Sequence, residues 1–311
     1  MGNALKYCFS YFTEGVCQFF RNLFKKEKNL SSFNGHKNIT VEYGGKVLSE
    51  FLINKKPFAA VRLGSTETSS YNNYLKIKHG FIKDYPKRVA EAMKIYSGFY
   101  PNNKESLNMF GERIDAVLKN SDIYGRLGSF MEDYIIKLHC PKIIAIQNKS
   151  IDPLRGLWTK DLIGKKVLVV SPFSEQIISQ YRNRKHIFPE ESKILPEFTL
   201  LTYSSPMTLG SSYVENETFF SLLDKMVNDI KKIDFEVALV GCGAYGTLLC
   251  LEIKSMGKSA IQTAGATQLL FGLFGKRWEN YDYVKKYVNE WWRRPDTKPQ
   301  GFQKIENGCY W

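Results

Sequence analysis

The stretch VALVGCGAYGTLLCLEIKSMGKSAIQTAG, from Val237 to Gly265, constrains the fold more than any other part of the chain. An apolar run is followed by glycines at positions 241, 243 and 246, then by a helical pattern and a second apolar run. The spacing G-x-G-x-x-G after a strand predicts a tight turn whose backbone N–H groups and following helix N-terminus face an anion. We expect a phosphorylated ligand there, with a purely structural turn as the alternative.

The rest of the chain alternates apolar runs and amphipathic segments in the same way. The predicted strands cover 58–64, 142–148, 165–173, 198–205, 236–241 and 259–264. The predicted helices cover 46–54, 174–184 and 216–233, and the stretch 86–138 is mostly helical. Buried strands separated by helices predict an α/β fold, Rossmann-like, with a mostly parallel sheet and helices on both faces. We expect this domain to occupy residues 40–311, after a polar linker.

Ligands of such sheets bind at the carboxyl ends of the strands. Five segments rich in Gly, Ser or Thr follow predicted strands: RLGSTETSS, SPFSEQ, YSSPMTLGSS, GCGAYG and TAGATQ. We expect all five at one rim of the sheet, with Tyr245 stacking on a nucleobase or donating a hydrogen bond. The candidate ligand-binding residues in the later segments are Ser171, Gly241, Gly243, Tyr245, Gly246, Gly265, Thr267 and Gln268.

A nicotinamide dinucleotide requires an acidic residue near the end of the strand that follows the glycine turn, where it binds the ribose hydroxyls. That region reads Ile261, Gln262 and Thr263, without a carboxylate. The pattern therefore favours another phosphorylated ligand, such as a sugar nucleotide, and keeps a nicotinamide-dependent oxidoreductase as the alternative.

The first strand exit, VRLGSTE, carries Arg62, Gly64, Ser65 and Glu67. A guanidinium at the ligand edge of a sheet suits the oxygens of a diphosphate. Glu67 is a candidate for holding a metal ion or accepting a proton. The alternative is an internal Arg62–Glu67 ion pair that only shapes the loop.

VRLGSTE resembles the R-x-G-D-G-E stretch of the GT-D type glycosyltransferases, a bacterial family with a Rossmann-like fold. The segments 158–177 and 238–278 and the final GCYW are similar to the same family, so the likeness covers residues 40–311. The resemblance implies transfer of a sugar from a nucleoside diphosphate donor, UDP-linked, to a glycan or lipid-linked acceptor of a surface polysaccharide such as capsule or O-antigen.

In this resemblance the family's Asp-x-Glu motif, which helps to hold a divalent metal ion, falls on Ser65 and Glu67. Ser is a weaker metal ligand than a carboxylate. The diphosphate is therefore neutralised either by Mn²⁺ or Mg²⁺ through Glu67 or by Arg62, Gly64 and Ser65 at the strand exit. Arg62 and Glu67 are the expected catalytic residues, with Glu67 as the base.

Residues 1–30 form a separate amphipathic segment. Apolar side chains recur at steps of three and four between Leu5 and Leu23, which predicts a helix with one apolar stripe. It carries Lys6, Glu14 and Arg21, so it is a poor membrane-spanning helix. We expect it to lie in a membrane interface or to dock on the protein itself or on another subunit.

The formal net charge of +13 indicates an anionic partner. Acidic residues alternate with basic ones in the aromatic tail, so nucleic acid is not expected. Six cysteines without metal-ligand spacing indicate reduced thiols. We therefore expect a cytoplasmic protein, peripheral on the inner membrane face; a non-catalytic, membrane-associated glycan-assembly protein and an oligomer stay open.

Overall fold

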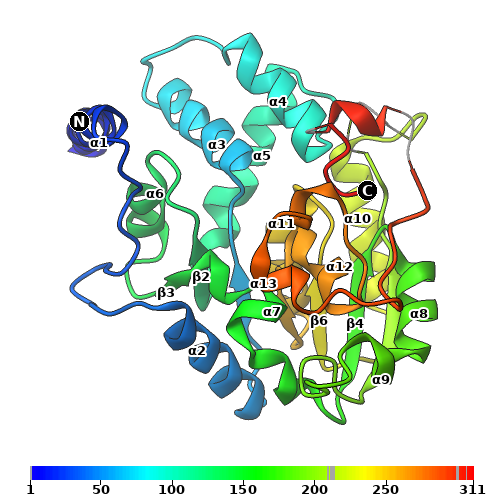
Figure 1. Ribbon diagram of the computed structural model, residues 1–311. Coiled ribbons are helices and arrows are strands. Elements are labelled where there is room, and N and C mark those ends of the chain that lie inside the picture. The colour runs from blue at the N-terminus through cyan, green and yellow to red at the C-terminus, as the bar shows by residue number, and fades with distance from the viewer. Residues whose placement is uncertain (1, 209, 211–213, 299–300, 306) are drawn as a thin grey trace.

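The structure is a computed structural model that describes residues 2–208, 210, 214–298, 301–305 and 307–311. Its centre is a seven-stranded sheet in the order β3-β2-β1-β7-β6-β4-β5, with every described pair of neighbours parallel (Figure 1). The strands are β1 (Ala59–Val61), β2 (Ile123–Arg126), β3 (Ile144–Gln147), β4 (Lys166–Ser171), β5 (Thr199–Ser204), β6 (Val237–Val240) and β7 (Ser259–Ile261). The predicted α/β class is confirmed.

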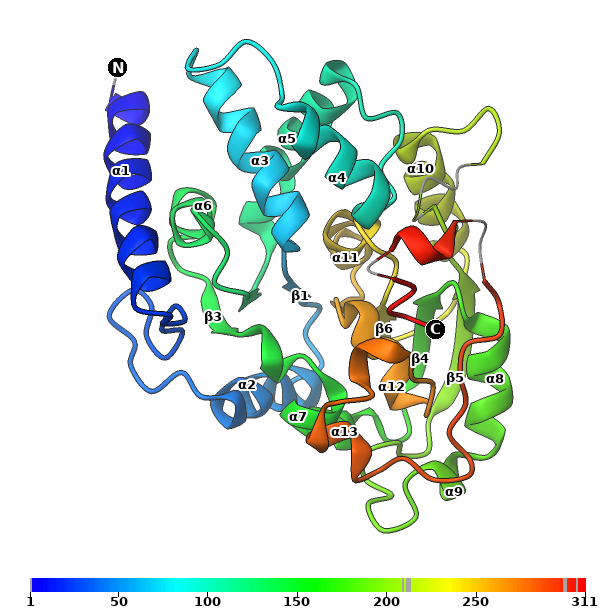
Figure 2. The same ribbon diagram turned by 45° about the horizontal axis from the view of Figure 1, so that its top comes forward.

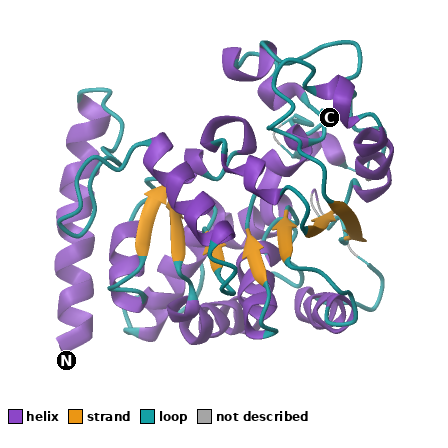
Figure 3. Ribbon diagram, turned by 90° about the horizontal axis from the view of Figure 1, so that it is seen from below, coloured by secondary structure: helices purple, strands orange, loops and turns teal. Residues whose placement is uncertain are grey.

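Helices cover both faces of the sheet (Figure 3). One face carries α3 (Ser65–Lys78), α4 (Lys87–Ser97), α5 (Lys104–Val117), α6 (Glu132–His139), α10 (Phe219–Ile230) and α11 (Tyr245–Ser255). The other carries α2 (Val41–Ile53), α7 (Pro153–Gly156), α8 (Ser174–Arg182), α9 (Arg184–Ile187), α12 (Thr267–Leu270) and α13 (Asp282–Lys285). Alternate strand residues enter opposite cores: Ala59 and Val61 pack in the first, and Ala60 packs in the second.

Two elements differ from the sequence prediction. The stretch 86–138 was expected to be mostly helical, but it contains β2 between α5 and α6. This strand has four fully covered residues, including Gly125 and Arg126, so it shows neither alternation nor an apolar run. The segment after Arg62 was expected to be a loop, but α3 begins at Ser65. Its covered face includes Asn72 and Asn73, which hides the amphipathic pattern.

The predicted helix in residues 1–30 is present as α1 (Gly2–Leu23) and lies at the edge of the molecule beside α3 and α6 (Figure 2). Tyr7 is 2% exposed, and its hydroxyl donates to Asn72 Oδ1 at 2.6 Å. The Tyr11 ring packs edge-on against Phe130 with centroids 5.0 Å apart. These contacts hold α1 on the domain.

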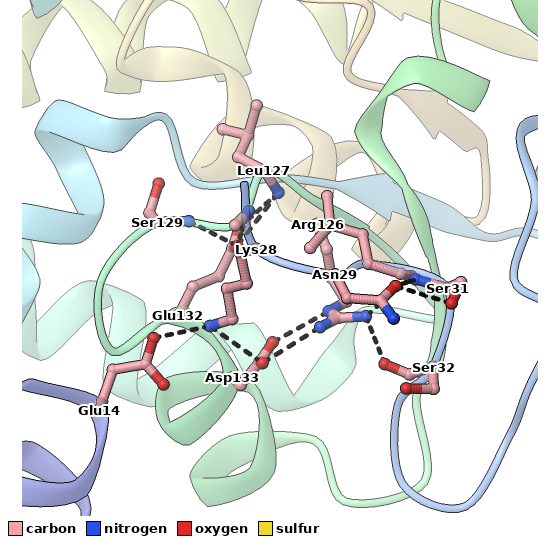
Figure 4. A network of polar contacts seen from close by, with 12 residues as sticks. Glu14, Lys28, Asn29, Ser31, Ser32, Arg126, Leu127, Ser129, Glu132 and Asp133 are labelled. Atoms are coloured by element: carbon pink, nitrogen blue, oxygen red, sulfur yellow. Dashed lines mark hydrogen bonds and ion pairs between the residues drawn. The ribbon is translucent and has the colours of Figure 1, made fainter. Parts of the chain in front are cut away.

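The chain after α1 is tied to β2 and α6 by a polar network (Figure 4). Lys28 forms ion pairs with Glu14 and Asp133, each at 3.1 Å. Arg126 donates two hydrogen bonds to the Asp133 carboxylate, and its Nη1 donates to the backbone carbonyl of Ser32 at 2.9 Å. Arg126 is only 2% exposed. Its hydrogen bonds therefore hold the start of the predicted linker against the domain, so this part of the linker is not surrounded by water.

Within the described part of the chain, no helix has both the length and the apolar character needed to cross a bilayer. None of the six cysteines, all of which lie in the described part of the chain, forms a disulfide.

Candidate functional site

A pocket opens at the carboxyl edge of the sheet, where β4 leads outward to β5 and β6 leads the opposite way to β7. Such a reversal leaves a crevice between the two strand exits. All five segments expected at this rim contribute to the pocket, although 209, 211 and 212 in the third lie outside the described residues. The lining includes Arg62, Ser171, Phe173, Met207, Thr208, Gly241, Cys242, Gly243, Tyr245, Ala264, Gly265, Thr267, Gln268, Tyr310 and Trp311.

The three glycines of the turn are required by its geometry. Gly243 has a φ of 61°, in the left-handed region that favours glycine. A Cβ at Gly241 would lie 2.6 Å from the carbonyl oxygen of Ala264, and one at Gly246 would lie 2.6 Å from Gln262 Nε2. Gly241 and Gly243 line the pocket, whereas Gly246 lies behind it and allows α11 to approach the end of β7.

The turn leaves three backbone N–H groups without a protein acceptor. In the described residues, the N–H groups of Cys242, Gly243 and Tyr245 make no hydrogen bond, and all three residues line the pocket. Tyr245 is the first residue of α11, whose N-terminus has no side-chain cap. Free N–H groups and the positive end of a helix dipole form a suitable environment for an anion.

Arg62 follows β1 and faces the same pocket. Its backbone is held firmly: its N–H donates to Gln262 Oε1 at 2.9 Å, and its carbonyl accepts from the Thr247 hydroxyl at 2.7 Å. Its half-buried guanidinium forms no ion pair or hydrogen bond with any described residue. A cation in this position is available for an anionic ligand.

Gln262 occupies the position at which a nicotinamide-binding fold requires an acidic residue. Its side chain is 4% exposed, and its Oε1 accepts from both the Arg62 N–H and the Thr247 hydroxyl. The side chain therefore joins the exits of β1 and β7 to α11 and is not directed toward a ribose.

Glu67 and Ser65 lie outside the pocket, on the first turn of α3. The Glu67 carboxylate folds back over Gly64, where it would overlap an added Cβ, and Arg62 Nη1 lies 3.2 Å from the same Cβ position. Arg62 and Glu67 nevertheless form no ion pair. The alternative prediction, an internal ion pair between them that only shapes the loop, is therefore wrong.

The metal ion expected through Glu67 and the diphosphate oxygens stays a prediction. Among the residues that the structure describes, no three His, Cys, Asp or Glu side chains gather closely enough to hold a metal ion. Ser65 is exposed and supplies no carboxylate.

Tyr245 was expected to stack on a nucleobase, but its ring already stacks on Phe219, with centroids 4.3 Å apart and planes 9° apart. Its side chain is 1% exposed. Its hydroxyl lies beside Thr208 and lacks a hydrogen-bond partner of acceptable geometry. Burial raises the pKa of Tyr245 to about 12, so the hydroxyl keeps its proton at neutral pH.

Four other predicted residues shape the pocket through internal contacts. Ser171 Oγ accepts from the Phe173 N–H, and the Thr267 hydroxyl donates to the Ala264 carbonyl. Gln268 Nε2 donates to the Tyr310 carbonyl. A Cβ at Gly265 would lie 2.7 Å from Tyr310 Cε1, so this glycine makes room for the ring.

A second, wider groove of about 460 Å³ adjoins the pocket and shares Arg62, Ala264 and Gly265 with it. Arg277 and Trp278 are neighbours in the sequence and place a cation beside an aromatic ring in the wall of this groove. The wall also includes Arg155 and Tyr281. Basic groups together with aromatic rings suit an anionic saccharide.

The Asp152 carboxylate also lines this groove, although the sequence pattern did not indicate it as a site residue. Its Oδ1 accepts from the Leu154 N–H and its Oδ2 from the Tyr283 hydroxyl. Burial raises the pKa of Asp152, and this effect exceeds the lowering by the two hydrogen bonds. In the sequence, Asp before Pro153 indicates only a helix cap.

The Tyr310 and Trp311 side chains form one wall of the pocket and reduce its enclosed volume to about 80 Å³. Arg277 donates to the Tyr310 hydroxyl at 3.0 Å, and the Trp311 indole donates to the Thr297 carbonyl at 2.7 Å. Burial raises the pKa of Tyr310, and the nearby charges of Arg277 and Arg62 oppose that rise. A ligand of nucleotide size requires this wall to move outward.

Comparisons of the chain with protein-family models, with curated proteins and with solved structures return no match.

Proposed function

We propose that this protein is a glycosyltransferase that moves a sugar from a nucleoside diphosphate donor, UDP-linked, to a growing surface glycan such as capsule or O-antigen. The proposal rests on one observation: in a single pocket, neither the Arg62 guanidinium nor three N–H groups of the glycine turn have a hydrogen-bond partner among the described residues. A diphosphate satisfies both at once. The resemblance of VRLGSTE to the GT-D type enzymes adds that the diphosphate carries a sugar.

In the proposed reaction the bond between the anomeric carbon and the diphosphate oxygen breaks, and the acceptor hydroxyl oxygen forms the new bond. The leaving diphosphate gains negative charge as this bond breaks. Arg62 and the N–H groups of Cys242 and Gly243 stabilise that charge because they are fixed before the reaction begins. The Tyr245 hydroxyl donates to a phosphate or ribose oxygen.

The groove on the other side of Arg62 is the proposed acceptor site. Tyr281, which is 50% exposed, offers an aromatic face to a sugar ring, and the cations suit an acidic or phosphorylated glycan. The acceptor hydroxyl proton passes to a carboxylate, for which Glu67 and Asp152 are the two candidates. Glu67→Gln and Asp152→Asn separate them, since only the variant of the base should lose turnover while donor binding remains.

Donor binding is tested by thermal unfolding of the full chain with UDP, UDP-sugars, GDP-mannose and NADH. A ligand at 100 times its dissociation constant adds about 2.7 kcal/mol to the free energy of unfolding, so a true donor should raise the melting temperature measurably. Arg62→Ala should abolish this rise, whereas Arg182→Ala on the exposed side of α8 should keep it. No rise with any sugar nucleotide would contradict the proposal.

The two rival functions give other outcomes. A nicotinamide-dependent oxidoreductase should respond to NADH alone, with a change in cofactor fluorescence on binding. A non-catalytic glycan-assembly protein should support surface glycan formation in cells even as the Arg62→Ala variant. Loss of the glycan in that variant, with protein levels unchanged, favours the transferase.

A further inference from the structure

The apolar stripe of α1 lies on the side turned away from the domain. At about 100° per residue, its large side chains fall within an arc of about 100°. They are Leu5, Phe9, Phe12, Phe19, Phe20 and Leu23, exposed by 51–75%. Tyr7 and Tyr11, which hold the helix on the domain, lie on the opposite side. The docking contacts therefore leave the apolar stripe of α1 exposed to water.

The apolar face continues into a groove of about 710 Å³ between α1 and Phe81. Cys8, Phe12 and Phe19 line it from the helix, and the Phe81 side chain, 45% exposed, lines it from the domain. A continuous exposed apolar surface of this kind marks an interaction site.

Charge decides which partner fits. Lys6 near the start of α1 and Lys25 and Lys26 just after its end are exposed. Glu14 is neutralised by Arg21 and Lys28, which leaves Glu27 as the exposed acidic residue of the described segment 2–28. Both ends of the apolar face are therefore positively charged. A second copy packed face to face would bring lysines against lysines in either orientation, whereas an anionic lipid surface complements them.

We propose that α1 is an interfacial anchor that lies in the plane of an anionic membrane. Its phenylalanine side chains insert among the acyl chains, and its lysines meet the headgroups. Because Tyr7 and Tyr11 join the opposite side of the helix to α3 and α6, the anchor also sets the orientation of the whole domain on the membrane.

The test is co-sedimentation of the full chain with vesicles of phosphatidylcholine alone or with one quarter phosphatidylglycerol. We expect binding to the anionic vesicles that weakens as salt rises. The double variant Phe9→Asp/Phe12→Asp should lower the partition coefficient at least about tenfold. The control Ile53→Asp/Ile163→Asp changes two apolar residues of similar exposure, 61% and 67%, outside α1 and should bind like the parent protein.

Tryptophan fluorescence and light scattering distinguish membrane insertion from self-association. A Phe12→Trp variant should show a blue-shifted emission with anionic vesicles and quenching by brominated lipids, which reports insertion and not mere adsorption. Light scattering measures the oligomeric state in parallel. A dimer that the Phe9→Asp/Phe12→Asp variant converts to a monomer, without vesicle binding by the parent protein, would overturn the proposal in favour of a second copy. Donor binding at the sheet edge should be the same in all these variants, so the two proposals fail independently.

Discussion

Replacing Arg62 by Met separates a ligand-binding guanidinium from a structural one. Methionine keeps a flexible apolar stem of similar length, and the backbone hydrogen bonds of residue 62 to Gln262 and Thr247 do not depend on the side chain. Because the guanidinium has no partner among the described residues, the variant breaks no ion pair. It instead removes a half-buried cation from the pocket.

We expect Arg62→Met to weaken UDP binding without lowering the free energy of unfolding. A hydrogen bond to a charged group contributes about 1.5–3 kcal/mol, so UDP should bind roughly 10 to 150 times more weakly to Arg62→Met. The free energy of unfolding should stay the same or rise by up to about 1 kcal/mol, because a desolvated charge is lost. Removing one member of a buried ion pair would instead cost about 3–5 kcal/mol.

The assay combines urea unfolding without ligand and calorimetric titration with UDP at one ionic strength. Arg182→Met, on the exposed side of α8, is the matched control and should change neither quantity. A loss of more than about 2 kcal/mol of stability in Arg62→Met would assign the guanidinium a structural role. Unchanged UDP affinity would refute the diphosphate site itself.

Three further predictions concern the same elements. Tyr245→Phe keeps the ring stack but removes a buried hydroxyl without a partner, so stability should stay within about 1 kcal/mol of the parent while UDP affinity falls by calorimetry. Gly265→Ala places a methyl group 2.7 Å from Tyr310 Cε1 and should destabilise the fold by about 1–3 kcal/mol in urea; an unchanged stability would contradict a tightly packed pocket wall. Burial would raise the pKa of Asp133, but the hydrogen bonds from Arg126 and the charge of Lys28 outweigh it and lower the pKa below 3.8. Asp133 therefore stabilises the fold above pH 3.8, and this contribution is lost as the pH falls through the lowered pKa. Asp133→Asn should lower the melting temperature at pH 7 and differ less from the parent at pH 3; an equal difference at both values would contradict the assigned ion pairs.

Local patterns predicted the glycine turn correctly because its constraints are local. The φ of 61° at Gly243 and the close approach of Ala264 to Gly241 occur within one strand–turn–helix–strand unit. The same holds for β4 and β6, whose continuous apolar runs are typical of strands buried on both faces of a sheet. The convergence of five strand exits on one rim followed from parallel strand direction alone.

Contacts between residues far apart in the chain determine the environments of Arg126, Tyr245 and Asp152, which the sequence pattern did not predict. Arg126 appears in the sequence as a charged residue in a helical stretch, yet it lies fully covered in β2 because Asp133 and two carbonyls of the linker surround it. Tyr245 was expected to face a base, but Phe219, far from it in the chain, occupies the ring face. Asp152 joins the candidate site only because α7 and α13 pack beside the exit of β7.

By itself, the sequence determined the α/β class, the parallel sheet, the glycine turn and the apolar stripe of the first helix, since each depends on residue spacing along a single element. Only the tertiary structure decided that Arg62 has no side-chain partner among the described residues, that the Glu67 carboxylate folds back over Gly64, and that the stripe of α1 faces outward. The physical reason is that pairing, burial and exposure are properties of neighbours in space, and those neighbours come from elements tens to hundreds of residues apart.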